Sequence, residues 1–573
     1  MEKINRVSQA DSLRCSGKAC CFFKAMKNRD PNLKRSLLCR FFDDMPHVDD
    51  PLHVLVMSGL WSLAMSNPDD PTLPSLPSFF TCMANLIHKA LNDLHWLHKD
   101  QNIYIPYYAA HIIGSYTINS PRFVAKAADV VVVPPLVELL KGRLSWVEQR
   151  VAVRALGHLA SFDSTFEAVA SYEEEVVKVS MRVVFDESVK TKQKEKYQSE
   201  LLSRGLGDEG MEEQRTEEWT SQLQCWSIQL LNCFASKQRS IDVIVSDGRF
   251  LTCLCNMWGS PAGIGLLRIL CQSKAGRKAL SRHKDVVLSL CNLSRSSDDF
   301  QYMGIDCLLL LLRDKNTRDS VLEGSVSCLV DLVELGELGR RRDVGGAIAR
   351  ALLVDYKDGL YCDKEVERAL GVVWDLKVGR RREARMGKED LEKRRGFVSS
   401  KRRQGNEQFW GGDINGAMGA YSEALELCPL RLWKERLVLY SNRAQCHLLL
   451  READEAISDA TRALSLSRPA NSHAKSLWRR SQAYDAKGLA KESLLDCLMF
   501  INVFFGSDEK RRCDKVPYYA IRMICKQMSY VGLFSSASSA IDGESDDIES
   551  IGKDGKQLNM VAFKSGVASF LSL

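Results

Sequence analysis

Five polar side chains in the second half of the chain have the types and spacing to hold a short acidic peptide. They are Arg402, Asn406, Asn442, Lys475 and Arg479. Arg402 and Asn406 are four residues apart, as are Lys475 and Arg479, so each pair shares one face of a helix. Amide N–H groups can bind a carboxylate, and lysine and arginine can neutralise it together with a neighbouring aspartate. The set predicts a site for a peptide end with two carboxylates, where each charge-assisted hydrogen bond contributes about 1.5–3 kcal/mol.

Three helical hairpins within residues 398–505 are expected to position these side chains. In the first hairpin, small residues, an aromatic residue and a proline follow one another at Gly405, Ala417, Tyr421, Ala424 and Pro429. Matching residues recur in the next two hairpins, at Ala444, Ala456, Ala460, Ala463 and Pro469, and at Ser481, Tyr484, Ser493, Cys497 and Phe500. Because small residues let two helices cross closely and proline ends a helix, this pattern favours tight hairpins whose first helices line a groove.

The hairpins resemble the tetratricopeptide repeat (TPR) family, in which three repeats form the usual minimal module. Their polar set is similar to the two-carboxylate clamp of co-chaperone TPR domains. That clamp has Lys and Asn in the first repeat, Asn in the second, and Lys and Arg in the third. Four positions carry the family's residue type: Asn406, Asn442, Lys475 and Arg479. The resemblance implies binding of the EEVD tail of cytosolic heat-shock chaperones of the ninety- and seventy-kilodalton classes.

Arg402 is the departure from this pattern, because the family usually has lysine there. The positive charge is kept, but a planar guanidinium is not equivalent to a compact ammonium. Lys401 could take the lysine's place only if the helix phase differed by one residue. We expect the same class of peptide with an altered affinity.

The N-terminal half has its clearest repeat pattern at residues 127–161. Val130–Leu140 has the sequence VVVVPPLVELL, and a loop that ends at Ser145 separates it from the apolar-striped segment Val147–Ser161. Proline is tolerated in the first helical turn, so the pattern predicts two helices. It resembles an armadillo repeat, a family in which asparagines on successive last helices bind extended peptides. His158 stands at that asparagine position, which puts this mode of peptide binding in doubt.

Helical apolar runs continue along the chain without strand alternation, including a helix expected at Phe79–Leu97. We therefore predict an all-α protein, an α-solenoid in which armadillo/HEAT-like helical repeats precede a three-repeat TPR domain. A compact, irregular all-helical N-terminal domain is the alternative. The predicted parts are an N-terminal helical segment (1–50), the armadillo/HEAT-like domain (51–375) with a charged loop around 186–218, a basic linker helix (376–397), the TPR domain (398–505), a capping helix (506–534) and a mostly disordered tail (535–573).

Basic residues are concentrated just before and at the start of the predicted TPR domain. They form three clusters, Arg380–Arg382, Lys393–Arg395 and Lys401–Arg403. One interpretation is a nuclear-import signal. The interspersed Glu389 and Asp390 favour the other, a linking helix that adds positive field beside the TPR domain.

Composition narrows the class of protein. The chain has 573 residues, of which 45% are hydrophobic and 27% charged, as in globular proteins with several domains or one long repeat array. A formal net charge of +6 is too small at this length to indicate nucleic-acid binding. We also expect no membrane span and no secretion signal, because neither kind of apolar segment is present. Cysteines inside apolar runs fit a cytoplasmic location, to which the import interpretation of the basic clusters would add a nuclear one.

The sequence indicates no metal, cofactor or catalytic site. Cys15 and Cys20 lack the matching partners of a zinc site, and His95 and His98 lack a third ligand. Gly411–Gly419 is rich in glycine but lacks the Lys-Ser/Thr of a phosphate-binding loop. We therefore expect no cofactor and no enzymatic activity.

A non-enzymatic adaptor or co-chaperone is the leading function class, with an unknown client protein on the armadillo-like part. One alternative is an assembly scaffold that binds a different acidic C-terminus without a chaperone link. Another is a subunit of an enzyme complex, such as a ubiquitin-ligase adaptor. Myosin-directed chaperones resemble this combination of repeats, but their TPR module comes first, so no myosin client is inferred. The order found here resembles the plant ARM-repeat/TPR-like proteins, whose name describes architecture and implies no settled activity.

Overall fold

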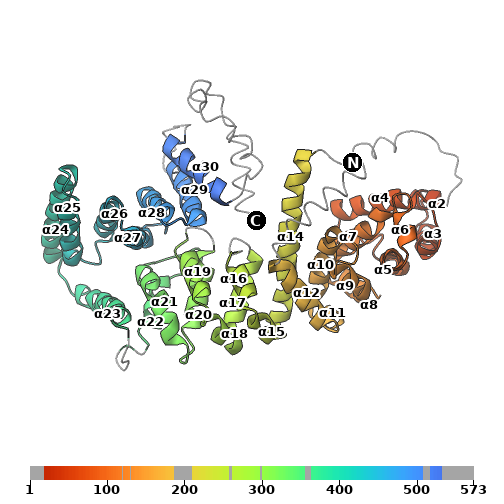
Figure 1. The fold of residues 1–573 in the computed structure, drawn as a ribbon, viewed down its shortest axis with the longest axis horizontal. Helices are drawn as coiled ribbons and strands as arrows, with labels where there is room; N and C mark the ends of the chain where they lie inside the picture. The colour runs from red at the N-terminus through yellow and green to blue at the C-terminus, as the bar shows by residue number, and fades with distance from the viewer. Residues whose placement is uncertain are drawn as a thin grey trace, which may run out of the picture. The chain divides into compact units, whose positions relative to one another are not determined.

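The computed structural model describes residues 19–118, 120–129, 131–185, 209–256, 261–296, 300–354, 356, 363–506 and 516–531. Within these ranges the regular elements are helices, apart from an isolated bridge between Leu338 and Arg341 (Figure 1). The chain divides into two compact units, Met1–Cys253 and Leu254–Leu573. The predicted all-α, solenoid-like fold class is confirmed.

The first unit is a succession of helices of mostly moderate length. They are α2 (Ala19–Met26), α3 (Pro31–Asp44), η1 (Met45–His47), α4 (His53–Ser66), α5 (Pro77–Asn92), α6 (Leu94–His98), η2 (Asn102–Tyr104), α7 (Ile105–Thr117), α8 (Pro121–Asp129), α9 (Val133–Leu140), α10 (Trp146–Ser161), α11 (Asp163–Ala170), α12 (Glu173–Phe185), α14 (Glu209–Ser236), α15 (Ile241–Ser246) and the start of α16 (Gly248–Asn256). Helix α10 lies at the centre and packs against α7, α9, α11 and α14. Consecutive helices thus cover one another, as in a helical repeat.

The predicted pair of helices at residues 127–161 forms with the expected caps. Helix α9 carries Pro134 and Pro135 in its first turn, where the missing N–H groups would have no partner within the helix. Ser145 caps α10, because its side-chain oxygen accepts a hydrogen bond from the N–H of Val147 at 3.1 Å. The apolar stripe of α10 is buried.

Two segments of the first unit differ from their predicted extents. The helix expected at Phe79–Leu97 is interrupted at Asp93, whose carboxylate accepts from the N–H of Trp96 at 2.9 Å and so begins the short helix α6. A capping aspartate in the middle of an apolar pattern was the local signal for this break. Within the loop expected around 186–218, residues 209–218 belong to α14, and 186–208 lie outside the described residues.

The second unit begins with a further array of helices. They are α17 (Pro261–Gln272), α18 (Lys274–Leu280), α19 (Lys284–Ser294), α20 (Gln301–Leu311), α21 (Arg318–Asp331), α22 (Val344–Leu352) and α23 (Lys364–Glu383). We call α17–α22 the array. Its core is aliphatic and includes buried cysteines, in keeping with the apolar runs of the sequence.

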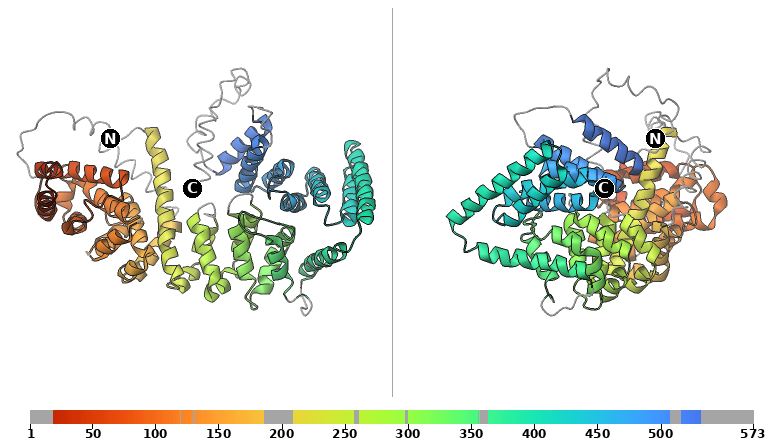
Figure 2. Two further views of the ribbon diagram at one scale, coloured as in Figure 1. Left: turned by 180° about the vertical axis from the view of Figure 1, so that it is seen from behind. Right: turned by 60° about the vertical axis from the view of Figure 1, so that its left-hand side comes forward.

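Three helical hairpins follow the array, and we call them the TPR-like module. Their helices are α24 (Lys388–Trp410) with α25 (Ile414–Leu427), α26 (Trp433–Leu449) with α27 (Ala453–Leu466), and α28 (Ala474–Ala486) with α29 (Ala490–Gly506); they are the teal to blue helices in Figure 2. The small and aromatic residues predicted to pack the hairpins are buried, with Pro469 as the exposed exception.

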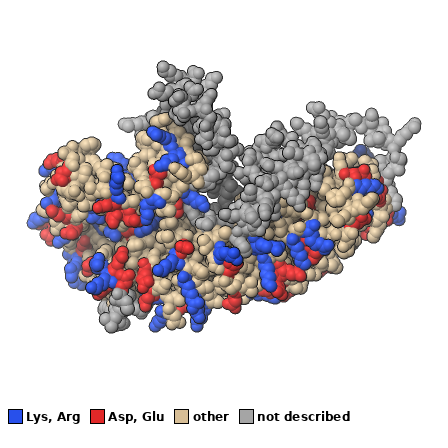
Figure 3. Space-filling model, viewed as in Figure 1, with Lys and Arg blue, Asp and Glu red and all other residues tan. Residues whose placement is uncertain are grey.

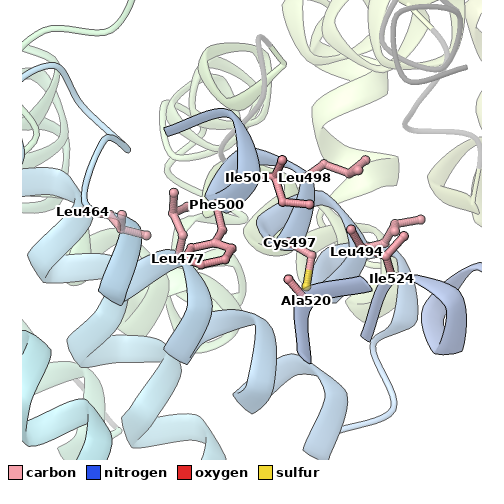
Figure 4. Packing of buried hydrophobic residues seen from close by; sticks show 9 residues of the cluster. All are labelled: Leu464, Leu477, Leu494, Cys497, Leu498, Phe500, Ile501, Ala520 and Ile524. Carbon is pink, nitrogen blue, oxygen red and sulfur yellow. The ribbon is translucent and has the colours of Figure 1, made fainter. Parts of the chain in front are cut away.

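A last helix, α30 (Tyr518–Val531), packs against α29 at the end of the module. Figure 4 shows the apolar cluster that joins them to α27 and α28: Leu464, Leu477, Leu494, Cys497, Leu498, Phe500, Ile501, Ala520 and Ile524. Because the final hairpin would otherwise expose this apolar face, α30 occupies the position expected of a capping helix. The predicted tail, 535–573, lies outside the described residues.

The basic segment 376–397 is not one linker helix but is divided between α23 and α24. The chain turns at Ala384–Gly387, and α24 begins ten residues before the predicted start of the module. Glu383 ends α23 and accepts hydrogen bonds from the backbone N–H groups of Leu430 and Arg431, at 2.9 and 3.2 Å. This tertiary contact fixes the turn, and no local sequence pattern predicts the contact.

No described helix is both long and apolar enough to cross a lipid bilayer. The same residues contain no cluster of three or more histidine, cysteine, aspartate or glutamate side chains that could hold a metal ion. His95 and His98 lie on the five-residue helix α6, and Cys15 lies outside the described part of the chain.

Candidate peptide-binding site

The structure places the predicted residues on the first helix of each hairpin. Arg402 and Asn406 lie on α24, Asn442 on α26, and Lys475 and Arg479 on α28. Helix α26 contacts both α24 and α28, so the three helices form a continuous row. The predicted register of the repeats therefore brings side chains separated by more than 70 residues of sequence onto neighbouring helices.

The two amides are joined directly. Asn442 Nδ2 donates a hydrogen bond to Asn406 Oδ1 at 3.3 Å, and the hydroxyl of Tyr421 donates to the same oxygen at 2.8 Å. With Oδ1 occupied by two donors, the orientation of the Asn406 amide is set and its NH₂ group is directed to other acceptors. A carboxylate is the acceptor that such a donor pair suits best.

Gly405 explains how Tyr421 reaches Asn406. A Cβ atom at this position would lie 2.6 Å from Tyr421 Cε1, so only glycine lets the ring pack against α24. Tyr421 itself is buried, and its hydroxyl group donates a hydrogen bond to the side-chain oxygen of Asn406. The Gly405 and Tyr421 pair of the sequence pattern thus serves the site as well as the packing.

Arg479 is held in place by neutral groups. Its Nη1 donates to the backbone oxygen and the hydroxyl of Ser441, each at 2.6 Å, and its Nε donates to Gln445 Oε1 at 3.1 Å. Burial lowers the pKa of Arg479, and among the described residues no carboxylate pairs with it. The guanidinium is therefore fixed in direction while its charge is left uncompensated.

Arg402 and Lys475 also make no ion pair or hydrogen bond with the described residues. Lys475 is exposed and Arg402 is half-buried. Burial raises the pKa of Tyr421, while the nearby charges of Arg479 and Arg402 oppose that rise. The charges that act on this hydroxyl group thus come from the first and third hairpins. Lys475 lies one helical turn before Arg479 on α28.

Lys401 does not take the place of Arg402. Its ammonium pairs with Glu423 on α25 at 2.6 Å. Among the described residues Arg402, unlike Lys401, therefore has no ion-pair partner. This matches the four-residue spacing between Arg402 and Asn406 from which the site was predicted.

Two ion pairs, each within one hairpin, support the first helices of the second and third hairpins and were not predicted. Arg443 binds Asp459 through two hydrogen bonds at 2.7 and 2.8 Å, and Arg480 binds Asp496 in the same way at 2.7 and 2.8 Å. Each arginine directly follows a site residue and lies sixteen positions before its aspartate. This repeated spacing was the sequence signal that could have revealed them. The pairs fix α26 against α27 and α28 against α29.

His473 adds a neutral group at the edge of the site. Its Nδ1 lies 2.8 Å from the hydroxyl of Ser476. Burial, together with the charges of Arg479 and Lys475, lowers the pKa of His473 to about 4. The imidazole is therefore uncharged at neutral pH, and the positive charges of Arg479 and Lys475 help to keep it so.

Comparison with known proteins finds similarity to repeat families. Residues 13–246 match the family described as "Plant ARM repeat". The N-terminal part is thus similar to plant ARM repeats. Together with the curated relatives below, this match supports the predicted ARM- and TPR-like repeats.

Three curated relatives match short stretches of the chain. "Protein unc-45 homolog B" of Danio rerio is 34% identical over 85 residues, which is 15% of this chain and 9% of that protein. "Mitochondrial import receptor subunit TOM70" of Rattus norvegicus is 32% identical over 115 residues, 20% of this chain and 18% of that protein. "Sperm-associated antigen 1" of Mus musculus is 33% identical over 173 residues, 28% of this chain and 18% of that protein. The chain spans less than a fifth of the length of each relative.

Proposed function

We propose that this protein is a non-enzymatic adaptor that binds the acidic C-terminal tail of a cytosolic heat-shock chaperone in the groove of its TPR-like module. The chaperones are those of the ninety- and seventy-kilodalton classes, whose tails end in EEVD. The ARM-like repeats engage a second protein. The observation that carries the proposal is the pair of joined amides, Asn406 and Asn442, on a row of helices that also carries Arg402, Lys475 and Arg479, cations that pair with no carboxylate of the described residues.

The chemistry of a tail ending in aspartate suits this arrangement. Its terminal carboxylate would accept from the Asn406 and Asn442 amides, and its aspartate side chain would meet Lys475 and Arg479. Arg479 needs little reorganisation, because Ser441 and Gln445 already hold its guanidinium. A preorganised donor loses less conformational entropy on binding than a free side chain does.

The alternative is an assembly scaffold that binds a different acidic C-terminus and has no chaperone link. Arg402 favours this alternative, because a planar fork can bind a carboxylate through two parallel hydrogen bonds where lysine offers one point charge. Both functions use the same groove. They differ in which protein supplies the carboxylates.

Affinity capture from a cell extract separates the two functions. The full chain is compared with Lys475→Ala/Arg479→Ala and with a control, Arg394→Ala/Arg403→Ala, which removes the same charge from exposed positions of α24. The adaptor proposal expects the first pair alone to lose heat-shock chaperones while other partners stay bound. Chaperone capture that is equal in all three proteins would refute it, and selective loss of another acidic-tailed protein would favour the scaffold.

Location is part of the same proposal. We infer a cytoplasmic protein, with nuclear import through the basic residues of α23 and α24 as the alternative. A fluorescent fusion of the full chain distinguishes the two, because the cytoplasmic assignment requires signal outside the nucleus.

A further inference from the structure

A small pocket lies in the first unit, between α3, η1 and the start of α4, helices that are labelled in Figure 1. It has a volume of about 230 Å³, and its walls are formed by the apolar side chains of Leu37, Phe41, Met45 and Val48. Pockets that take a whole small molecule usually have about 300–1,000 Å³. The volume of this pocket therefore suits a single side chain of another protein.

His53, the first residue of α4, also lines the pocket. The residue is 3% exposed, so its imidazole lies at the floor, where it makes an edge-on contact with the ring of Phe41, with centroids 6.1 Å apart. Neither ring nitrogen has a hydrogen-bond partner among the described residues. Burial lowers the pKa of His53, so the imidazole is neutral and offers one donor and one acceptor. A ligand that satisfies these buried groups gains affinity.

Contacts from outside the pocket hold its wall in place. Lys89 on α5 donates from Nζ to the carbonyl oxygen of Pro46 at 3.0 Å, and Lys99, the residue after α6, pairs with Asp49 at 2.8 Å. The segment 45–49, which carries two of the apolar wall residues, is thus attached at both ends. A pocket that is formed before the ligand arrives loses less conformational entropy on binding.

The rim of the pocket carries one charge of each sign. Arg40 and Asp44 are exposed, lie one helical turn apart on α3 and form no ion pair with the described residues. Arg40 can donate to a backbone carbonyl, and Asp44 can accept from a backbone N–H, so the rim suits an uncharged polypeptide backbone. The described side chains on the face drawn in Figure 3 are likewise of both signs, whereas nucleic acids require a broad basic surface.

We propose that this pocket, which we call the His53 pocket, binds a tyrosine side chain of a partner protein. The aromatic ring packs against the apolar walls, and its hydroxyl group forms a hydrogen bond with the imidazole of His53. A phenol hydroxyl both donates and accepts, as a neutral imidazole does, and it lies at the far end of its ring. Phenylalanine would leave His53 without a partner, and the indole N–H of tryptophan can only donate.

The surroundings of the pocket favour a protein as the source of this side chain. Leu33, one helical turn before Leu37, and Leu52, the neighbour of His53, are both exposed. Exposed apolar groups with a polar rim are typical of protein–protein interaction sites. Residues 1–18, which precede α2, contain no aromatic residue and so do not supply the ring. The inference gives an anchor to the second partner of the proposed adaptor, and it does not depend on the TPR-like groove.

Titration followed by ligand-detected NMR tests the proposal on the full chain. The probe is an acetylated and amidated pentapeptide, glycine–serine–tyrosine–serine–glycine, compared with the same peptide carrying phenylalanine or tryptophan in place of tyrosine. These peptides have no carboxylate, so the TPR-like groove contributes nothing and its failure cannot be mistaken for a failure of the pocket. The variants are His53→Phe and Leu37→Ala. Their controls are His98→Phe and Leu63→Ala, at exposed positions of α6 and α4.

We expect the wild type to bind the tyrosine peptide about fivefold more tightly than the phenylalanine peptide, because one hydrogen bond distinguishes them. His53→Phe should bind both peptides equally, and Leu37→Ala should weaken both about threefold, because part of the apolar wall is lost. Both controls should behave as the wild type does.

Three results would overturn the proposal. They are equal binding of the tyrosine and phenylalanine peptides by the wild type, a tyrosine preference that persists in His53→Phe, and tighter binding of the tryptophan peptide. If circular dichroism shows that His53→Phe is unfolded, Leu37→Ala decides, because an affinity equal to that of Leu63→Ala would also overturn it.

Discussion

Arg462 of the TPR-like module donates from Nε to the buried carboxylate of Asp331, at the end of the array helix α21, at 2.9 Å. The same carboxylate accepts from Arg295, the residue that follows α19, and from Ser458 on α27, at 2.7 and 2.6 Å. The second helix of the middle hairpin is therefore bonded to the array, while the candidate groove lies on the first helices. None of the proposed site residues takes part in this contact.

Removing the carboxylate should destabilise the second unit strongly. Asp331→Ala leaves Arg295 and Arg462 without their counter-charge, and breaking a buried pair of this kind costs about 3–5 kcal/mol. Denaturant unfolding of the full chain measures the change. The matched control is Asp319→Ala, an exposed aspartate on the same helix, which should change stability by less than about 0.5 kcal/mol. Equal effects of the two variants would contradict this view of Asp331.

The same carboxylate should make the second unit sensitive to strong acid. Burial alone would raise the pKa of Asp331, but the charges of Arg295 and Arg462 outweigh it, and the pKa is lowered from 3.8. A carboxyl with a lower pKa in the folded state adds stability above the unfolded value, and this stability is lost as pH falls through the folded value. The wild type should thus lose stability below about pH 4 more steeply than Asp331→Asn does. The test is to measure the melting temperatures of both proteins at a series of pH values from pH 5 downwards. Parallel curves of melting temperature against pH would contradict the prediction.

The first unit should weaken at a milder pH because of its buried histidines. Burial and the charge of Arg154 lower the pKa of His158 to about 4. A histidine with a pKa below its unfolded value adds stability above about pH 6.5, and the stability is lost as pH falls toward the folded value. The asparagine in His158→Asn does not titrate. Between pH 6.5 and 5, the free energy of unfolding of this variant should therefore fall by about 2 kcal/mol less than that of the wild type.

Chemical denaturation at the two pH values measures this difference. His98→Asn, at an exposed position of α6, serves as the control and should keep the wild-type dependence. If the free energy of unfolding of His158→Asn fell with pH as much as that of the wild type, His158 would be charged in the folded protein at the lower pH.

Arg402 should contribute to peptide affinity through its charge. Arg402→Ala is expected to weaken binding of an acidic-tailed peptide about tenfold, because the cation facing the joined amides is lost. Arg402→Lys restores the charge without the planar fork, so its affinity should stay within about threefold of the wild type. Isothermal titration calorimetry of the full chain gives both values, and Arg403→Ala is the control at the exposed neighbouring position. An unchanged affinity in Arg402→Ala would remove Arg402 from the site.

The structure follows the sequence most closely where the signals are local. Small residues at fixed spacing, prolines at helix starts and the capping Ser145 predict the hairpins and the α9–α10 pair, because each depends on contacts within one or two helices. The register of the site residues follows from the same periodicity. The residue types of Arg402 and Asn406 and their four-residue spacing were therefore sufficient to place them together.

The features that escaped prediction depend on distant contacts. Glu383 bonds to a turn 47 residues away, and Asp331 bonds to Arg462, 131 residues away. A buried charge with its partner in another repeat resembles a surface charge when only the local sequence is considered. The pocket that His53 shares with α3 likewise becomes visible only when the two segments are packed together.

The central claim is that the groove recognises a free, carboxylate-terminated acidic tail. The most direct measurement is calorimetric titration of the full chain with acetylated MEEVD peptide and with the same peptide ending in an amide, for the wild type and for Lys475→Ala/Arg479→Ala. We predict that only the wild type with the free carboxylate binds tightly, and that the amide or the double substitution each weakens binding at least about tenfold. Equal binding of acid and amide, or undiminished binding by the double variant, would contradict it.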